Sequence, residues 1–112
     1  MTPCHIRLLQ KDKVVELSYS HDTQYQLSCE YLRVHTPSAE AKGHGGQGGK
    51  LPKNKQNVNI IAIEPVGNYA VKFIFDDGHG SGIYTWDYLY DLAVNQHHYW
   101  QKYLTQLTKQ PS

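Results

Sequence analysis

The stretch AVKFIFDDGHGSGIYTWDYLYDL, residues 70–92, contains patterns typical of three kinds of local structure, one after another. Its first part alternates the apolar residues Val71, Phe73 and Phe75 with other side chains, which is the period of a half-buried strand. The central DGHGSG contains the Asp-Gly pair that tight hairpin turns favour, and apolar residues resume after it. The sequence therefore predicts a hairpin that leads directly into a helix beginning near Trp86.

An earlier part of the chain repeats this plan. Residues 14–20 alternate apolar and polar side chains, a short polar break follows, and residues 24–28 resume as a partner strand before a helix at 29–35. Residues 27–32 align with residues 84–89 if the later turn has one extra residue. We therefore expect an α+β fold in which two hairpin-then-helix units form a mostly antiparallel sheet covered by helices.

The C-terminal part of the chain places apolar side chains at helical spacing, which indicates an amphipathic helix. Together the patterns predict strands near 14–20, 24–28, 58–64, 70–76 and 82–85, helices near 29–35, 86–94 and 97–108, and a flexible Gly/Lys-rich loop at about 43–56. The aromatic and leucine residues expected mainly in the core are Trp86, Leu89, Trp100 and Leu104.

At 112 residues the chain has the length of one domain, spanning 1–112. Its formal charge of +1 gives no overall attraction to nucleic acid, so we expect no nucleic-acid partner. No apolar run is long enough for a signal peptide or a membrane span, so we expect a cytoplasmic protein without a membrane partner. Cys4 and Cys29 are too few and too far apart for a disulfide framework or a redox pair.

The segment GHGGQGGK, residues 43–50, satisfies the G-x-G-x-x-G pattern of dinucleotide-binding loops. Such a loop needs a strand before it and a helix after it, and here Pro52 follows within a polar stretch. The lysines in and after the segment form a basic patch suited to phosphate, RNA or an acidic surface, but no aromatic residues that could stack on bases lie between them. A solvated loop is the expected structure.

Catalytic motifs are lacking in the sequence. There is no G-x-S-x-G elbow, and the cysteines have no nucleophile signature around them. Asp76 and Asp77 are adjacent at the end of a strand, so their side chains should point in opposite directions, which is a poor geometry for paired acid–base work. We therefore expect a turn at this point and no catalysis.

Histidine is frequent, with seven residues in the chain. His35, His44 and His79 each lie near an expected loop and would converge if the two units pack side by side. Neutral imidazole is a good ligand for iron or zinc. Because no H-x-x-x-H or C-x-x-C spacing accompanies them, the three histidines form a candidate metal site that depends entirely on the fold.

Three strings together carry a family resemblance: YLRVHTPSAEAKGHG (31–45), IIAIEPVGNYAVKFIFDDGHGSGIYTWDYLY (60–90) and WQKYL (100–104). With them, over roughly residues 6–107, the chain resembles the gamma-butyrobetaine hydroxylase-like N-terminal domain family. In small bacterial proteins of this family the domain stands alone without an assigned function. In larger proteins it precedes a 2-oxoglutarate- and iron-dependent oxygenase domain or follows an Mrp-type P-loop ATPase of iron–sulphur assembly. The present sequence contains no oxygenase domain, so the resemblance does not imply hydroxylase activity.

The resemblance also bears on metal binding. The hydroxylase version of the domain holds zinc through three cysteines shortly after a Leu-Arg pair and through a histidine in the second hairpin. Leu32-Arg33 matches that pair and His79 matches the histidine. The cysteine positions correspond, within a residue or so, to Thr36, Ser38 and Ala41. None of these can be a thiolate, so the resemblance implies that the tetrahedral zinc site is lost. The candidate replacements in a more open iron or zinc site with His79 are His35, His44 and Glu40.

Three function classes remain open at this point. We expect a small non-catalytic binding or adaptor module, linked to iron or iron–sulphur metabolism, with a protein partner. The alternatives are an iron- or zinc-binding protein that uses the loop histidines, and an unrecognised enzyme or an accessory to an oxygenase. An adaptor should expose aromatic residues, and the residues predicted to form its interaction surface are Arg33, Tyr69, Tyr84 and Tyr88.

Overall fold

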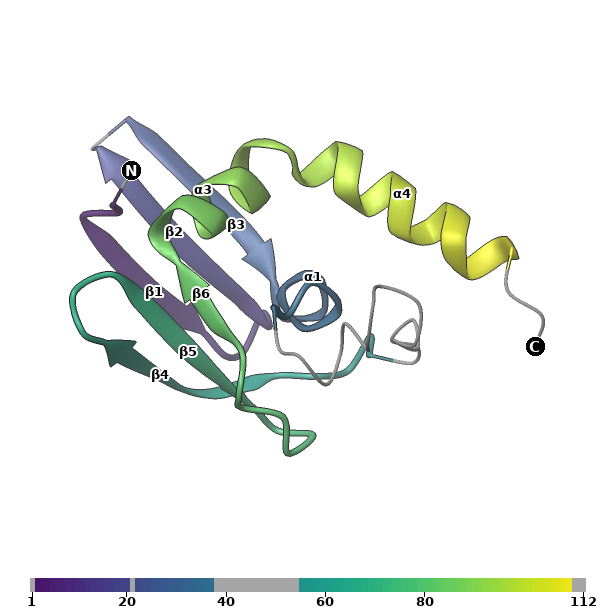
Figure 1. Cartoon of the computed structure of the whole chain (residues 1–112), viewed down its shortest axis with the longest axis horizontal. Helices are drawn as coiled ribbons and strands as arrows, with labels where there is room; N and C mark the ends of the chain where they lie inside the picture. The colour runs from purple at the N-terminus through teal and green to yellow at the C-terminus, as the bar shows by residue number, and fades with distance from the viewer. Residues whose placement is uncertain (1, 21, 38–54, 110–112) are drawn as a thin grey trace.

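The computed structural model describes residues 2–20, 22–37 and 55–109 (Figure 1). The strands in these ranges form two three-stranded antiparallel sheets with the orders β1-β2-β3 and β4-β5-β6. The first sheet consists of β1 (His5–Leu9), β2 (Val14–Ser20) and β3 (Thr23–Ser28), and the second of β4 (Ile60–Val66), β5 (Ala70–Phe75) and β6 (Ile83–Thr85). The helices are α1 (Cys29–Val34), α3 (Trp86–Val94) and α4 (Gln96–Lys109). The α+β class and the antiparallel pairing predicted from the sequence are confirmed.

The first sheet has one apolar and one polar face because β2 alternates between them. Val15 and Leu17 are fully buried on the inner face. Glu16 lies between them on the outer face, where its carboxylate is 3.3 Å from Arg7 Nη2 on β1 and accepts a hydrogen bond of 3.3 Å from Gln26 Nε2 on β3. The period-2 pattern therefore fixes which side of this sheet meets the core.

The second sheet follows the same rule. Val71, Phe73 and Phe75 on β5 are buried on the inner face, at 3%, 0% and 1% exposure. Lys72 lies between them on the other face, directly opposite Glu64 of β4. This is the alternation that the sequence of residues 70–92 predicts, with the aromatic side chains directed toward the core.

Both units change from strand to helix at a capping hydroxyl. Ser28, the last residue of β3, accepts a hydrogen bond of 3.0 Å from the Tyr31 amide through its side chain. Thr85, the last residue of β6, accepts the equivalent bond of 3.2 Å from the Tyr88 amide. A hydroxyl at this position satisfies an amide that the first turn of a helix leaves without a partner, so each helix begins directly after its strand.

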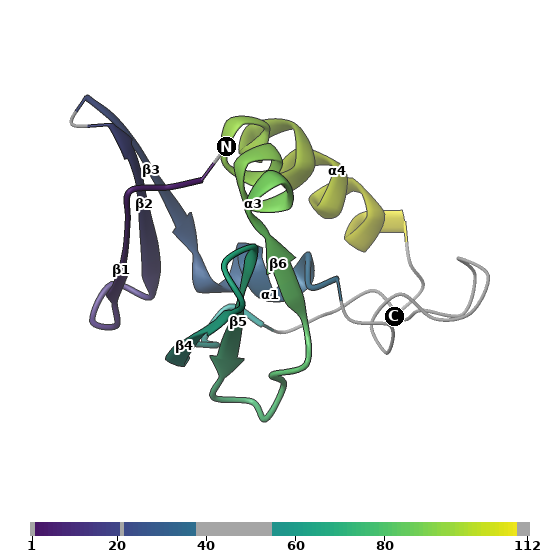
Figure 2. The same ribbon diagram turned by 60° about the vertical axis from the view of Figure 1, so that its left-hand side comes forward.

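The core lies where the two sheets and the helices meet (Figure 2). Helices α1 and α3 are joined by two reciprocal hydrogen bonds across this core. The Tyr31 hydroxyl of α1 donates to the Leu92 carbonyl at 2.7 Å, and the Tyr88 hydroxyl of α3 donates to the His35 carbonyl at 2.5 Å. Each tyrosine thus satisfies a carbonyl near the C-terminal end of the other helix, where the helix itself leaves carbonyls unbonded.

Most predicted elements are confirmed. β2 and α3 have the predicted bounds, and the other predicted strands and helices agree within two residues. Two features differ from the expectation. Strand β1 (His5–Leu9) is not among the predicted elements, and the strands divide between two sheets. Most of the loop expected at 43–56 falls outside the described residues.

The core predictions hold only in part. Leu89 is fully buried, and Trp86 and Trp100 are partly buried against the core. Leu104 is 39% exposed, so its assignment to the core is wrong. The reason is the direction of α4, which runs away from the sheets in Figure 1, so that only part of its apolar face is covered. Among the described residues, no helix has the length and apolar character needed to cross a membrane.

Candidate functional site

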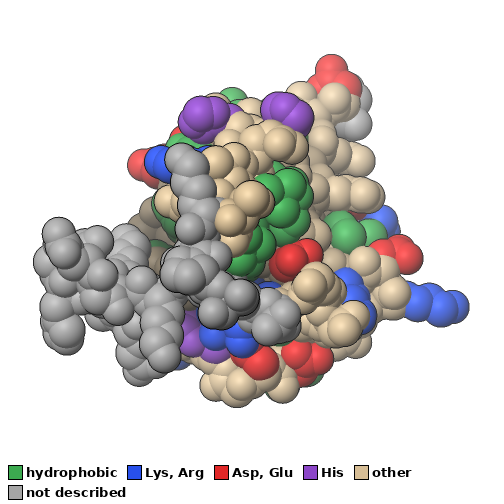
Figure 3. All heavy atoms as spheres, turned by 90° about the vertical axis from the view of Figure 1, so that its right-hand side faces the viewer, with side chains coloured by type: hydrophobic (Ala, Val, Ile, Leu, Met, Phe, Trp, Pro, Cys, Tyr) green, Lys and Arg blue, Asp and Glu red, His purple; other side chains and the backbone are tan. Residues whose placement is uncertain are grey.

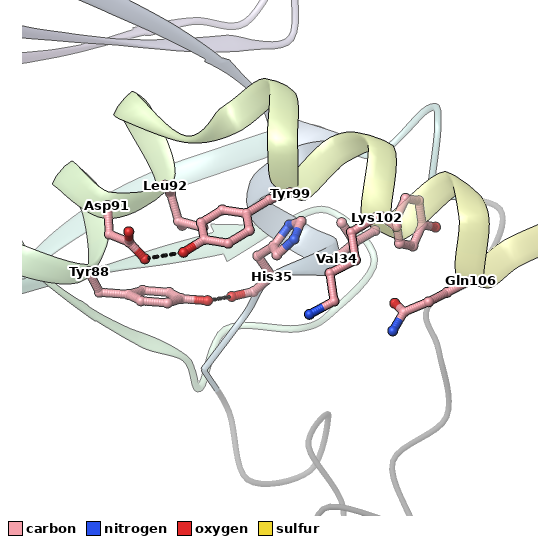
Figure 4. A pocket seen from close by; sticks show the side chains of 9 residues that line it. Val34, His35, Tyr88, Asp91, Leu92, Tyr99, Lys102 and Gln106 are labelled. Carbon is pink, nitrogen blue, oxygen red and sulfur yellow. Dashed lines mark hydrogen bonds between the residues drawn. The ribbon is translucent and has the colours of Figure 1, made fainter.

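A groove between α1, α3 and α4 brings polar and aromatic side chains together from three separate segments (Figure 4). It has a volume of about 360 Å³. Its lining consists of Val34, His35, Tyr88, Asp91, Leu92, Tyr99, Lys102, Tyr103 and Gln106. We call it the helix groove. Its volume lies at the lower end of the range of small-molecule and side-chain pockets, roughly 300–1,000 Å³.

Helical spacing explains why α4 contributes four of these residues. Tyr99, Lys102, Tyr103 and Gln106 are three or four positions apart, so they lie on one face of the helix. The residues that α3 contributes follow the same spacing. Figure 4 shows Tyr99 of α4 beside the imidazole of His35 at the end of α1. The groove therefore follows directly from packing α1 against the consecutive helices α3 and α4.

His35 forms the α1 wall of the helix groove. Its Nδ1 lies 2.9 Å from the Tyr31 carbonyl, and because a carbonyl only accepts, Nδ1 carries the proton. The imidazole lies among aromatic rings, with centroid distances of 4.7 Å to Tyr31, 5.9 Å to Tyr99 and 6.5 Å to Tyr103. Burial lowers the pKa of His35, and its bond to the Tyr31 carbonyl only partly offsets this. At neutral pH the ring is neutral and Nε2 is a hydrogen-bond acceptor.

Asp91 is held by structural hydrogen bonds. Its Oδ2 accepts from the Tyr99 hydroxyl at 2.7 Å, and its Oδ1 accepts from Asn95 Nδ2 at 2.8 Å. The pKa of Tyr88 is raised to about 12, mainly by burial and then by electrostatic interactions with Asp91 and Tyr99. The hydrogen bond to Asp91 also raises the pKa of Tyr99. Both phenols therefore stay protonated at neutral pH and join helices together, which is a structural role rather than acid–base chemistry.

Lys102 and Gln106 differ from the rest of the lining. Within the described residues neither side chain has a hydrogen-bond partner. Their polar ends project from α4 toward the same side of the groove in Figure 4. Asp91 lies at the other end, beyond Tyr99. The helix groove therefore has a basic end that offers hydrogen-bond donors and an acidic end whose oxygens are already bonded.

The second cluster of polar residues surrounds the turn at residues 76–82. Asp77 Oδ2 lies 2.9 Å from both Arg33 Nε and Lys55 Nζ, and Asp77 Oδ1 accepts from the His79 amide at 3.1 Å. Desolvation raises the pKa of Asp77, but the hydrogen bonds from Lys55, the His79 amide and Arg33, together with the charge of Arg33, outweigh it and lower the pKa to about 2. Ion pairs of Asp77 therefore connect the turn to Arg33 of α1 and to Lys55.

The same turn is fitted closely to the chain after α1. His79 Nε2 lies 3.0 Å from Thr36 Oγ1. A Cβ on Gly82 would lie 2.2 Å from Thr36 Oγ1, so any other residue fits there only if Thr36 moves. Gly78 has φ +93°, which confirms the turn predicted at Asp77-Gly78. We call Arg33, Thr36, Lys55, Asp77 and His79 the turn clasp.

The predicted metal residues are only partly brought together. His35 is directed into the helix groove, whereas His79 bonds Thr36 in the turn clasp, and His44 lies outside the described residues. Within the described part of the chain, no three His, Cys, Asp or Glu residues form a group suited to a metal ion. Thr36, which stands near a cysteine position of the resemblance, occupies its hydroxyl with His79. These residues do not fit the tetrahedral zinc site that the resemblance describes.

The predicted interaction surface needs one correction. Tyr84 is fully buried, and its hydroxyl donates to the Leu32 carbonyl at 2.6 Å, so it offers no surface to a partner. Its position on the inner face of β6 explains the burial. Tyr69 is 54% exposed, and Arg33 and Tyr88 are half-buried. Lys102 and Gln106 were not predicted from the sequence, although their spacing from Tyr99 places all three on one helical face.

Comparison with protein families gives a single clear answer. The family model described as gamma-butyrobetaine hydroxylase-like, N-terminal, matches residues 6–90. The chain belongs to this family. The match includes the whole turn clasp and ends within α3, so it covers only Val34, His35 and Tyr88 of the helix-groove lining.

Solved structures of similar proteins agree with this assignment. Two are solution structures determined by NMR. The first is 46% identical in sequence, and the match covers 96% of this chain and 85% of the neighbour's chain, with a TM-score of 0.83. The other is 50% identical, with 96% and 80% coverage and a TM-score of 0.79. The third is a crystal structure of a DUF971-family protein of unknown function from Acidithiobacillus ferrooxidans, 35% identical, with 82% and 92% coverage and a TM-score of 0.67. No curated protein matches the chain.

Proposed function

We propose that this family member is a non-catalytic binding module that holds a protein partner in the helix groove. The observation that carries the proposal is the unequal use of the polar groups there. Asp91, Tyr88 and Tyr99 are committed to bonds within the fold, whereas Lys102 and Gln106 have no hydrogen-bond partner among the described residues. Side chains that are bonded within the fold build the site, and side chains without such bonds are available to recognise a partner.

Surface properties support a macromolecular partner. Figure 3 shows hydrophobic side chains gathered on the end of the molecule that lies at the right in Figure 1. Leu104 on α4 is also 39% exposed. Aromatic residues surrounded by polar groups are the usual composition at the centre of protein interfaces. A protein that packs against this end of the molecule would bury exposed apolar side chains together with the groove.

The proposed pathway comes from the family resemblance. Larger proteins with a similar domain join it to an iron-dependent oxygenase or to an ATPase of iron–sulphur assembly. We therefore propose that the partner belongs to iron or iron–sulphur metabolism.

The test is partner capture that depends on the groove. The charge-reversal variant Lys102→Glu alters the groove, and Lys72→Glu on the outer face of β5 is the matched control. We expect a protein that wild type and Lys72→Glu retain and Lys102→Glu loses, with one-to-one binding of the purified protein by calorimetry. Equal capture by all three proteins, or by none, would contradict the proposal.

Metal content separates the adaptor from the metal-binding alternative. Untagged wild-type and His79→Ala proteins, purified without chelators, are compared by elemental analysis. The adaptor proposal expects no stoichiometric iron or zinc in either protein. Stoichiometric metal in the wild type that disappears in His79→Ala would favour the metal-binding function.

A further inference from the structure

We propose that the helix groove takes the carboxylate of an acidic side chain on the partner, with a neighbouring apolar side chain of the partner against its tyrosine rings. This inference rests on the proposed function and names the chemistry that the same site recognises. It is carried by the geometry of the basic end, by the position of the other charged groups, and by the rings between them.

The basic end provides the carboxylate site. Lys102 has no acidic partner among the described residues, and Gln106 lies one helical turn further along the same face of α4. An ammonium group and an amide NH₂ on one side of a groove can both donate to a carboxylate. Charge-assisted bonds of this kind are about twice as strong as neutral ones, so an anion is the best occupant of this end.

The other charged groups set the direction in which the ligand lies. Asp91 would repel a carboxylate, but it lies at the opposite end, with Tyr99 bonded to it (Figure 4). His35, in the wall between, is uncharged at neutral pH because burial lowers its pKa. On the α1 side, the charged group that acts on the groove is Glu30. Burial raises the pKa of Tyr103, and the charge of Glu30 raises it further. An acidic group is therefore accepted only at the end formed by Lys102 and Gln106.

The aromatic rings of the helix groove determine which partner side chain lies next to the carboxylate. Tyr99 and Tyr103 lie on the α4 face of the groove, with His35 between them and α1. The half-buried rings of Tyr99 and Tyr88 offer apolar faces, whereas Tyr103 is buried. The His35 Nε2 lone pair accepts a hydrogen bond, which suits a backbone amide of the partner. An acidic residue next to an apolar one in a protein segment satisfies all of these groups.

The test uses two capped peptides that differ in one charge, acetyl-Gly-Glu-Phe-Gly-amide and acetyl-Gly-Gln-Phe-Gly-amide, with free 3-phenylpropanoate as a third probe. Each is titrated into the ¹⁵N-labelled full chain, and amide shifts of Tyr99, Lys102 and Gln106 are followed. We expect the Glu peptide to shift these amides and to bind at least fivefold more tightly than the Gln peptide. Lys102→Gln should remove that preference, and Lys72→Gln should retain it.

Each other outcome overturns a defined part of the inference. Equal binding of the Glu and Gln peptides, or an unchanged preference in Lys102→Gln, would show that the carboxylate is not recognised, while groove-dependent capture of a partner would still stand. Binding of 3-phenylpropanoate without the Glu peptide would assign the site to a free organic acid. Shifts confined to residues outside the groove would contradict the site itself.

Discussion

The two halves of the fold share one plan and differ in what is added to it. In each half, three antiparallel strands lead into a helix, α1 after β1-β2-β3 and α3 after β4-β5-β6. Both helices begin at a hydroxyl cap, Ser28 or Thr85. Both end at a residue with nearly the same backbone angles, φ −108° and ψ 21° at His35, and φ −112° and ψ 21° at Asn95. Even the tyrosine bonds between the helices are reciprocal.

The additions lie in the second half. Helix α3 has nine residues where α1 has six, and α4 follows it after Asn95. The turn between β5 and β6 spans residues 76–82, whereas β2 and β3 are separated only by residues 21 and 22. Helix α4 forms one wall of the helix groove, and the long turn at residues 76–82 supplies Asp77 and His79 to the turn clasp. The shared positions therefore maintain the fold and supply part of the site, and the parts present only in the second half complete it.

The largest expected effects test whether the shared positions are equivalent. Leu32 and Leu89 occupy corresponding places in α1 and α3, and both are fully buried. Leu32→Ala and Leu89→Ala should each lower the free energy of unfolding by about 2–5 kcal/mol, because a cavity remains in a packed core. Urea denaturation followed by tryptophan fluorescence measures both. A loss below about 1 kcal/mol in only one variant would show that the halves do not contribute equally to the core.

The second prediction concerns the long turn, which has no counterpart in the first half. Gly82→Ala should lower the free energy of unfolding by about 1–3 kcal/mol, because its Cβ would lie 2.2 Å from Thr36 Oγ1 and the segment after α1 would have to move. Gly78→Ala is the matched control for strain alone, since nothing lies within 4 Å of its Cβ while φ is +93°. It should cost about 1–2 kcal/mol. If Gly82→Ala leaves the amide shifts of Thr36 unchanged in NMR spectra, the close fit is wrong.

The third prediction tests the reciprocal bonds. Removing the Tyr31 hydroxyl leaves the buried Leu92 carbonyl without its donor, so Tyr31→Phe should cost about 1–2 kcal/mol. Tyr88→Phe removes a bond that is only partly buried and should cost about 1 kcal/mol or less. Thermal unfolding of the single and double variants gives both values. A cost for Tyr88→Phe larger than that for Tyr31→Phe would break the proposed relation between burial and cost.

Local patterns made most of the fold predictable. The alternation in β2 and β5 and the capping hydroxyls before α1 and α3 are properties of neighbouring residues, and the structure has these elements where the sequence predicts them. Strand β1 has only Ile6 and Leu8 on its inner side, both partly buried, so its pattern is weak. The division into two sheets depends on packing between distant segments. No pattern within one strand carries that information.

The candidate site was less predictable for the same reason. The sequence shows that Tyr99, Lys102 and Gln106 share one face of a helix, but not that His35 lies against that face. The buried position of Tyr84 could have been inferred, since it follows the alternation of β6 and aligns with the core residue Leu27. The bonds of Asp77 to Arg33 and Lys55 join residues 44 and 22 positions apart, which only the folded chain brings together.

The smallest expected effect compares the aspartates of the two turns. In the first turn Asp22 accepts a hydrogen bond of 2.7 Å from the Ser20 hydroxyl, and this bond lowers the pKa of Asp22, which is fully exposed. In the second, the hydrogen bonds and charge of the turn clasp overcome desolvation and lower the pKa of Asp77 from 3.8 to about 2. Both carboxylates therefore bind protons more weakly in the folded chain than in the unfolded chain. Their stabilisation is present above the ordinary pKa and is lost as the pH falls below it.

For Asp77 this loss should occur as the pH falls from 3.8 to about 2. Because solvent screens the partly exposed carboxylate, Asp77→Asn should lower the free energy of unfolding by only about 1 kcal/mol at pH 7. The difference from wild type should shrink toward zero near pH 2, and Asp22→Asn should show a weaker dependence of the same sign. Urea unfolding at a series of pH values measures both. If the cost of Asp77→Asn is the same at pH 2 as at pH 7, the ion pairs with Arg33 and Lys55 do not stabilise the long turn, and its shape must come from the glycines alone.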